Sequence, residues 1–180
     1  MTDEEILLQY KIPASRDMAF KALVVKYQQR LYYHIRRMVL DHDDANDVLQ
    51  NAFIKAWKGL ENFREESQLY TWLYRIGTNE CLTFLANKQK KFSYSLDDME
   101  NHLANKLSSD KYFDGNQMEM KLQKAILTLP EKQKLVFNLR YYDEMPYEEM
   151  SKVLGTSEGA LKASYHHAVK KIELFVKEND

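Results

Sequence analysis

The residues that could bind a nucleic acid are concentrated near the end of the sequence. Residues 147 to 172 predict two helices joined by a tight turn that contains Gly155. The second helix carries cationic and imidazole side chains, which can neutralise phosphates or reach base edges. Helical hairpins with a glycine turn also occur in folds that bind no DNA, so this pattern alone only favours a DNA-binding helix-turn-helix. The side chains concerned are Lys162, His166, Lys170 and Lys171.

A second candidate site is the polar segment Phe63–Gln68, which has tryptophans and tyrosines on both sides and a basic stretch beyond it. Aromatic rings near positive charge can stack unpaired bases, which is how proteins hold single strands. We expect Trp57 and Trp72 to pack in the core. The polar segment between the helices is the better candidate for contact with a strand.

Other kinds of chemistry find no support in the sequence. The five histidines form no pair at metal-ligand spacing, and neither a glycine-rich phosphate loop nor a nucleophile arrangement is present. The single cysteine, Cys81, has no disulfide partner and is expected to be a small, partly buried apolar side chain. We therefore expect no metal, no cofactor and no enzymatic activity.

The N-terminus predicts a cytoplasmic protein, and the charge composition does not mark the chain as a nucleic-acid binder. With 26 Lys and Arg against 27 Asp and Glu, the net charge is −1, so any binding surface must come from local clustering. The N-terminus is acidic and lacks the apolar run of a secretory signal. No window approaches the roughly 20 apolar residues needed to cross a bilayer, so no membrane insertion is expected.

The elements that must position these side chains are helices. Only five Gly and three Pro occur in 180 residues, and no two-residue alternation is present, so we predict an all-α fold. Apolar residues at helical spacing predict helices from Phe20 to Met38, from Ala45 to Ala56, and from Leu69 toward Leu85, the last ending in the basic stretch 88–91. The aspartates of residues 41–44 suit the start of the second helix.

Helical periodicity fades over residues 92–117, where Ser, Asn and Asp accumulate, and this predicts a linker. Its aromatic residues suggest that parts of it dock on something. Helices resume at residue 118, and residues 128–131 predict a capping box with proline in the first turn of the next helix. Gly155 should end the helix of residues 147–154, and Ser157 should cap the last helix. The aromatic residues of the linker are Phe92, Tyr94, Tyr112 and Phe113.

Two stretches resemble extracytoplasmic-function sigma factors of the sigma-70 family. Residues 44–57, Phe63-Arg64 and residues 71–76 with Asn79 resemble the second conserved region of that family. The fourth region is resembled by Leu129-Pro130, Gln133, Val136-Phe137, Leu139-Arg140-Tyr141, residues 147–150, Leu154-Gly155 and Lys162. The resemblance implies a region 2-like domain at 1–91, a linker at 92–117 and a region 4-like helix-turn-helix domain at 118–180.

The resemblance also implies roles for individual residues. In the family, the helix that matches residues 44–57 docks on the clamp coiled coil of RNA polymerase, which points to Asp44, Asp47, Gln50 and Asn51. Asn51 stands where the family usually has Glu, so one charge is absent.

The segment 63–68 matches the part of the family that captures a flipped base of the minus-ten element. Flipping costs a few kcal/mol of stacking, which a polar pocket near positive charge can offset. The residues implied in recognition and melting of this element are Phe63, Arg64, Glu65, Ser67, Gln68, Arg75, Asn79, Lys88, Lys90 and Lys91.

The last helix matches the part of the family that reads the minus-35 element. The implied contacts are Ser157, Glu158, Lys162, His166 and Lys170. This chain has Ser164, His167 and Val169 where the family commonly has arginine. Fewer charges release fewer counterions, so we expect the isolated C-terminal domain to bind DNA weakly.

The resemblance therefore implies a sigma factor that directs core RNA polymerase to promoters. Its expected partners are the clamp and flap of the polymerase, double- and single-stranded promoter DNA, and an anti-sigma factor. Two alternatives remain open at this point. One is a helix-turn-helix regulator that acts without polymerase, and the other is a sigma-like decoy that sequesters an anti-sigma factor.

Overall fold

The computed structural model describes residues 1–92 and 116–179, and every regular element within these ranges is helical. The all-α prediction is confirmed. The chain divides into two compact units, Met1–Phe84 and Leu85–Asp180, and each is described by itself below. The predicted linker lies almost wholly in residues 93–115, outside the described residues, and so do its aromatic residues Tyr94, Tyr112 and Phe113.

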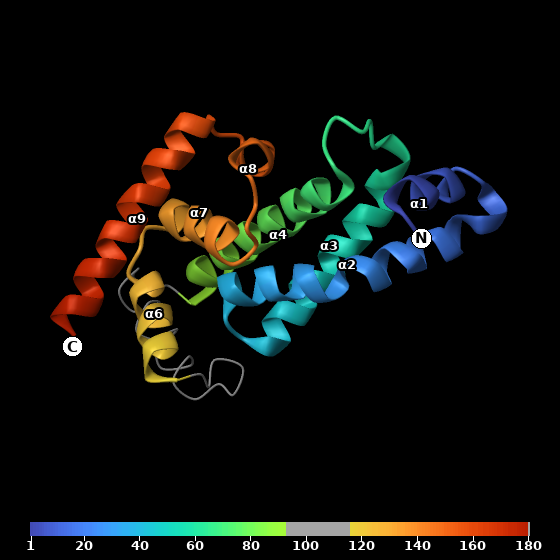
Figure 1. Cartoon of the computed structure of the whole chain (residues 1–180). Coiled ribbons are helices and arrows are strands. Elements are labelled where there is room, and N and C mark those ends of the chain that lie inside the picture. The colour runs from blue at the N-terminus through green and yellow to red at the C-terminus, as the bar shows by residue number, and fades with distance from the viewer. Residues whose placement is uncertain (93–115, 180) are drawn as a thin grey trace. The chain divides into compact units, whose positions relative to one another are not determined.

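The first unit is built on three long helices (Figure 1). They are α2 (Arg16–Val39), α3 (His42–Gly59) and α4 (Leu69–Phe92), and α4 runs past the unit boundary. The short 3-10 turns η1 (Pro13–Ser15) and η2 (Leu60–Asn62) precede α2 and follow α3. Helix α3 begins as expected, because Asp41 is its N-cap and accepts a hydrogen bond from the Asp44 N–H at 3.0 Å.

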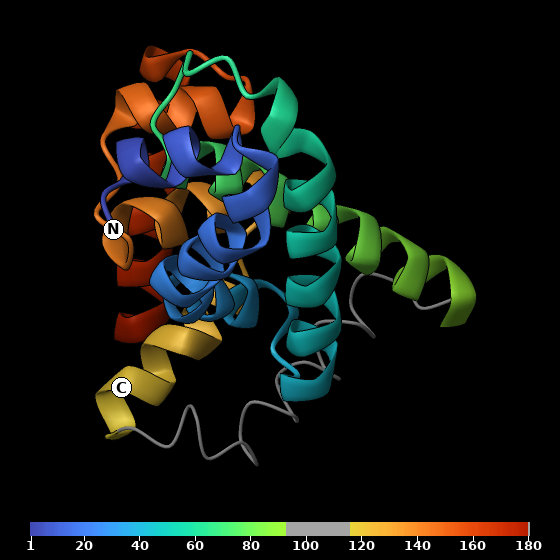
Figure 2. The same cartoon turned by 90° about the vertical axis from the view of Figure 1, so that its right-hand side faces the viewer.

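The sequence reasoning missed the first helix, α1 (Asp3–Tyr10), which packs on α2 (Figure 2). A capping box begins it, with the Glu5 N–H donating to Thr2 Oγ1 and the Thr2 N–H donating to Glu5 Oε2. The Tyr27 hydroxyl on α2 donates to the Asp3 carboxylate at 2.7 Å, and the Tyr10 hydroxyl donates to the Trp57 carbonyl at 2.7 Å. Helix α1 is thus tied to both α2 and the end of α3.

The core of the first unit leaves little room between α2 and α4. A Cβ at Gly77 would lie 2.8 Å from Leu31 Cδ1, so any larger residue here requires the buried Leu31 side chain to shift. Trp57 and Trp72 are half-buried and pack against the core, as predicted. Cys81 is fully buried, more deeply than expected, and burial raises the pKa of its thiol.

The second unit contains α6 (Gln117–Leu127), α7 (Glu131–Tyr141), α8 (Tyr147–Leu154) and α9 (Glu158–Glu178). Helix α9 packs against the other three. Gly155 ends α8 in the left-handed conformation, with φ 65°, and the Ser157 hydroxyl caps α9 by accepting from the Ala160 N–H at 3.3 Å. Both caps of this helix-turn-helix are therefore as predicted.

The predicted capping box at residues 128–131 is wrong. Thr128 ends α6, and its hydroxyl donates to the Ala125 carbonyl at 2.7 Å instead of accepting from the next helix. Pro130 is the N-cap of α7, and its side chain makes no capping hydrogen bond. The hydroxyl is already engaged by the helix behind it, and proline lacks one of the N–H groups that a cap would serve.

Candidate polymerase and nucleic-acid interfaces

The four residues of the expected clamp contact lie on the first turns of α3. Asp47, Gln50 and Asn51 are exposed, whereas Asp44 is half-buried beside the N-cap. Buried Ala45, Val48 and Ala52 anchor the opposite side of the helix. Helical spacing therefore presents carboxylate and amide groups to a partner along one accessible side of α3.

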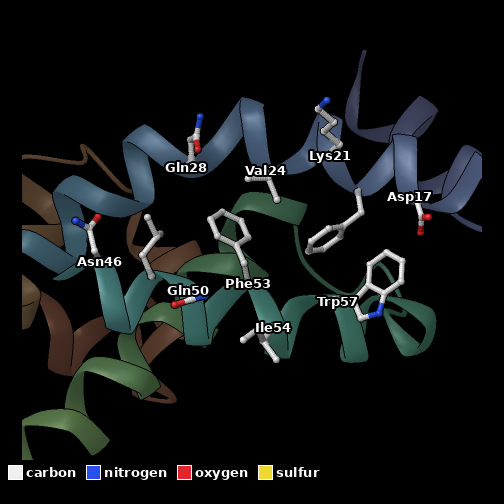
Figure 3. A pocket seen from close by; sticks show the side chains of 11 residues that line it. Asp17, Lys21, Val24, Gln28, Asn46, Gln50, Phe53, Ile54 and Trp57 are labelled. Atoms are coloured by element: carbon white, nitrogen blue, oxygen red, sulfur yellow. The ribbon is translucent and has the colours of Figure 1, made fainter. Parts of the chain in front are cut away.

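An open groove of about 610 Å³ lies between α2 and α3, next to this polar side (Figure 3). Phe53 and Trp57 rise from α3 toward α2, whereas Ile54, which is 46% exposed and also lines the groove, projects from the side of α3 away from α2. The remaining lining is apolar at the centre and polar at the edges, and consists of Asp17, Phe20, Lys21, Val24, Gln28, Asn46, Leu49 and Gln50. We call this feature the α2–α3 groove.

The sequence reasoning did not find the groove. Phe53 and Trp57 belong to the apolar stripe of α3 and do pack against the core, but both are only half-buried and also line this open groove. A signal was present, because Phe53, Ile54 and Trp57 stand three, four and seven residues after Gln50 and so continue its side of the helix. An apolar groove with a polar rim suits an amphipathic helix from a partner.

The polar loop before α4 presents some of its predicted side chains and packs others. Phe63 is half-buried, and its ring lies 5.2 Å from that of Trp72. Arg64, Glu65 and Gln68 are exposed, while Ser67 is half-buried and donates to the Gln68 carbonyl at 3.3 Å. Glu65 has φ 57°, a left-handed conformation that costs a non-glycine residue about 1–2 kcal/mol. The loop therefore holds a strained, solvent-facing turn over a packed aromatic pair.

Helix α4 carries the other expected minus-ten residues. Arg75 and Asn79 are exposed one turn apart, and Lys90 and Lys91 are exposed near the end, whereas Lys88 is half-buried. Two contacts join α4 to its neighbouring helices. Buried Thr78 shares a 2.8 Å hydrogen bond with His34 of α2, and Glu80 forms an ion pair with Lys55 of α3. The exposed side of α4 is therefore free to contact a DNA strand while these contacts with α2 and α3 stay in place.

Helix α9 presents all five expected minus-35 residues to solvent. Ser157 and Glu158 lie at its start, and Lys162, His166 and Lys170 follow at intervals of four residues, which places them along one side. Buried Leu161, Ala168 and Ile172 fix the other side. The Lys162 ammonium lies 5.7 Å from the centre of the Tyr147 ring on α8. This is the arrangement that a helix needs to enter a major groove.

Neither a membrane span nor a metal site is found in the described residues. Within residues 1–92 and 116–179, no helix combines the length and the apolar character of a membrane span. The same residues contain no group of three or more His, Cys, Asp or Glu side chains arranged to hold a metal ion.

Comparison with known proteins identifies the family of this chain. Residues 23–91 match the family model for sigma-70 region 2, and residues 119–172 match that for sigma-70 region 4. The RNA polymerase sigma-H factor of Pseudomonas aeruginosa is 31% identical over 163 residues, covering 86% of this chain and 84% of that protein. The ECF RNA polymerase sigma-E factor of Escherichia coli K12 is 29% identical over 181 residues, covering 96% and 93%.

Two solved structures share the fold. The sigma factor RpoE of Bartonella quintana, in complex with the anti-sigma factor NepR, matches with a TM-score of 0.68 and 19% identity, over 88% of this chain and 96% of that one. CnrH, in complex with the cytosolic domain of CnrY, matches with a TM-score of 0.71 and 21% identity, over 99% and 100%. The chain therefore belongs to the sigma-70 family of RNA polymerase sigma factors, in its extracytoplasmic-function group.

Proposed function

We propose that this sigma factor works through three surfaces: the α2–α3 groove with the polar side of α3 for core polymerase, the loop with α4 for the minus-ten element, and α9 for the minus-35 element. In this proposal residues 1–91 bind polymerase and melt the promoter, and residues 118–180 bind the upstream duplex. The chain is a non-enzymatic subunit that acts in the cytoplasm, where the polymerase is.

The open groove beside Asp47 and Gln50 is the observation that carries this proposal. It combines apolar area that a partner helix can bury with carboxylates that suit a basic partner. Burying exposed Ile54 and half-buried Phe53 would contribute about 25 cal/mol per Å² of apolar surface. We assign this groove to the clamp coiled coil of the polymerase, and the flap to the region 4-like domain.

Recognition of DNA divides into two physical steps in this proposal. Lys162 and Lys170 neutralise duplex phosphates, while Ser157 and Glu158 at the start of α9 reach base edges. Arg64, Arg75, Asn79 and the lysines near the end of α4 then hold the separated strand. Both solved relatives named above are in complexes with anti-sigma proteins, and we propose that this chain is controlled by one as well.

The test is transcription by core polymerase of the source bacterium, with and without this protein, on a pool of its genomic fragments. New transcript starts that share two spaced elements are expected. Asp47→Ala with Gln50→Ala should abolish them, and so should replacement of residues 63–68.

A matched pair of variants tests the groove itself. Ile54→Asp places a charge in the groove and should weaken core binding at least about tenfold, because an unpaired charge would be desolvated. Val25→Asp is the control, since Val25 is 63% exposed on α2 but does not line the groove.

The other outcomes separate the alternatives. Tight core binding without new starts would identify a decoy that sequesters an anti-sigma factor. Sequence-specific binding to duplex DNA without any binding to core polymerase would identify a conventional helix-turn-helix regulator. Absence of both core binding and promoter activity would overturn the proposal.

A further inference from the structure

Two cationic side chains from different helices lie close to the ring of Tyr147, the first residue of α8. The Arg140 guanidinium of α7 lies 4.7 Å from the ring centre, and the Lys162 ammonium of α9 lies 5.7 Å from it. Arg140 also donates to the Met145 carbonyl at 3.2 Å, just before α8 begins. Both separations are within the range in which a ring attracts a cation.

The position of this ring is set by packing and not by a mobile loop. Tyr147 is half-buried, and the rings of Phe137 and Tyr165 stack with centres 5.8 Å apart between α7 and α9, the helices that carry Arg140 and Lys162. The turn from α8 to α9 is closed by the Ser151 hydroxyl, which donates to the Thr156 carbonyl at 2.6 Å. The separation of Tyr147 from the backbone of Lys162 is therefore fixed by two helices and one braced turn.

A lysine side chain loses much conformational freedom when it is ordered, so one that is already ordered loses less on binding. Lys162 and Lys170 are both exposed and lie two turns apart on α9. Within the described part of the chain, Lys162 has an aromatic ring against it and no such ring is found for Lys170. The two lysines therefore form a natural comparison within one helix.

We propose that Tyr147 is a positioning residue, whose ring presents the Lys162 ammonium to a phosphate or base of duplex DNA. The inference rests on the proposed role of α9 in minus-35 binding and deepens it. Tyr147 itself needs no contact with DNA. Attraction of this kind at exposed sites corresponds to about a two- to fivefold change in an equilibrium constant.

The experiment measures binding of the holoenzyme, made from core polymerase and the full chain, to a promoter mapped by the transcription test, over a series of salt concentrations. Lys162→Gln should weaken binding and lower the salt slope by about one. Tyr147→Leu should weaken it about two- to fivefold when Lys162 is present and have no further effect in the Lys162→Gln background. Tyr147→Phe keeps the aromatic ring, so this variant should bind the promoter as tightly as the original protein does.

Lys170→Gln is the matched control. Its loss of affinity should be the same with Tyr147 or Leu at position 147, because distant and unconnected substitutions add. Equal losses from Tyr147→Leu with and without Lys162 would show a merely structural role and overturn the inference. If Lys162→Gln changes neither affinity nor salt slope, the assignment of α9 to DNA fails instead.

A second measurement does not depend on the folding of any Tyr147 variant. Carbon-13 methylation of the lysines keeps their charge, and Lys162→Gln identifies the signal of Lys162 in the full chain. The ring of Tyr147 should shift that signal upfield relative to the signal of Lys170. An unshifted Lys162 signal would overturn the inference, whatever the binding data.

Discussion

Gly77 on α4 stands against Leu31 of α2, and the gap between them sets how closely these helices pack. Gly77→Ala gains about 1 kcal/mol of helix propensity but places a methyl group 2.8 Å from Leu31 Cδ1. Overpacking costs about 1–3 kcal/mol, so we expect a net loss of stability of up to about 2 kcal/mol. Thermal unfolding should show a lower midpoint for the first unit, by about 4–8 °C per kcal/mol.

The control for this substitution is Gly159→Ala on α9. A Cβ at Gly159 would have no atom within 4 Å, so only the propensity gain applies, and stability should rise by up to about 1 kcal/mol. A Gly77→Ala protein as stable as the Gly159→Ala protein would contradict the tight packing of α2 on α4.

We expect the buried thiol of Cys81 to make the protein less stable at alkaline pH. Burial raises the pKa of its thiol above the ordinary value, so the folded state binds the proton more tightly than the unfolded state. This contribution is fully present below the unfolded pKa of about 9 and is lost as pH rises. Urea unfolding should show a decrease of about 2 kcal/mol between pH 7 and 10.5 from this group alone.

A Cys81→Ala variant gives the comparison for this titration. It should be less stable by a roughly constant amount below pH 9 and should lose less stability above it. The native thiol should also react slowly with a disulfide reagent, and react fully once the chain is unfolded. A fast-reacting native thiol, or equal alkaline slopes in both proteins, would show that Cys81 is not shielded.

At the residue scale, sequence periodicity predicted well which side chains of a helix would be exposed. Asp47, Gln50 and Asn51 are exposed because they lie away from the apolar stripe of α3. Periodicity says nothing of which neighbouring helix covers an apolar residue. The spacing of Phe53 after Gln50 indicates a shared side of α3, but the open groove itself depends on how α3 packs on α2. The contact of Phe63 with Trp72 likewise depends on how the loop packs on α4.

At the scale of elements, Gly155 controls the turn that aims α9. Its φ of 65° and ψ of 29° suit glycine, and no atom lies within 4 Å of a Cβ built there. Gly155→Ala should therefore cost about 1–2 kcal/mol through backbone strain alone, and Gly155→Asn should cost less. Thermal unfolding of the full chain measures both, and similar losses for Ala and Asn would indicate that something other than the left-handed conformation is disturbed.

Helix ends can be predicted from the sequence where a residue can cap only one helix. Asp41, Gly155 and Ser157 end or begin their helices as expected. Helix α1 is too short for apolar periodicity to predict it, although residues 2–5 carry a capping-box signal. A threonine between two helices can hydrogen-bond to either of them. The Thr128 hydroxyl donates to the Ala125 carbonyl of the preceding helix, α6, so it does not cap α7.

For the whole molecule, each of the two units contains a hydrophobic cluster made of its own residues. The first contains Ile6, Leu23, Ala56 and Leu73, and the second contains Ile126, Phe137, Ala168 and Ile172. The sequence indicated two helical parts because periodicity fades between them. The division by contacts, after Phe84, falls inside α4, where the helix continues without a break and the sequence carries no boundary signal.

Because one hydrophobic cluster of the first unit consists entirely of residues between Ile6 and Leu73, we expect a fragment of residues 1–92 to fold without the rest of the chain. Circular dichroism should show a helical fragment that melts cooperatively, although a domain of this size is only marginally stable. Gly77→Ala should destabilise the fragment and the full chain by the same free energy, since the Leu31 contact lies wholly inside it. A fragment that is unfolded, or a Gly77→Ala effect that appears only in the full chain, would show that residues beyond 92 contribute to this core. If the fragment folds and binds core polymerase, and Ile54→Asp abolishes that binding while Val25→Asp does not, the groove alone accounts for docking of the first unit.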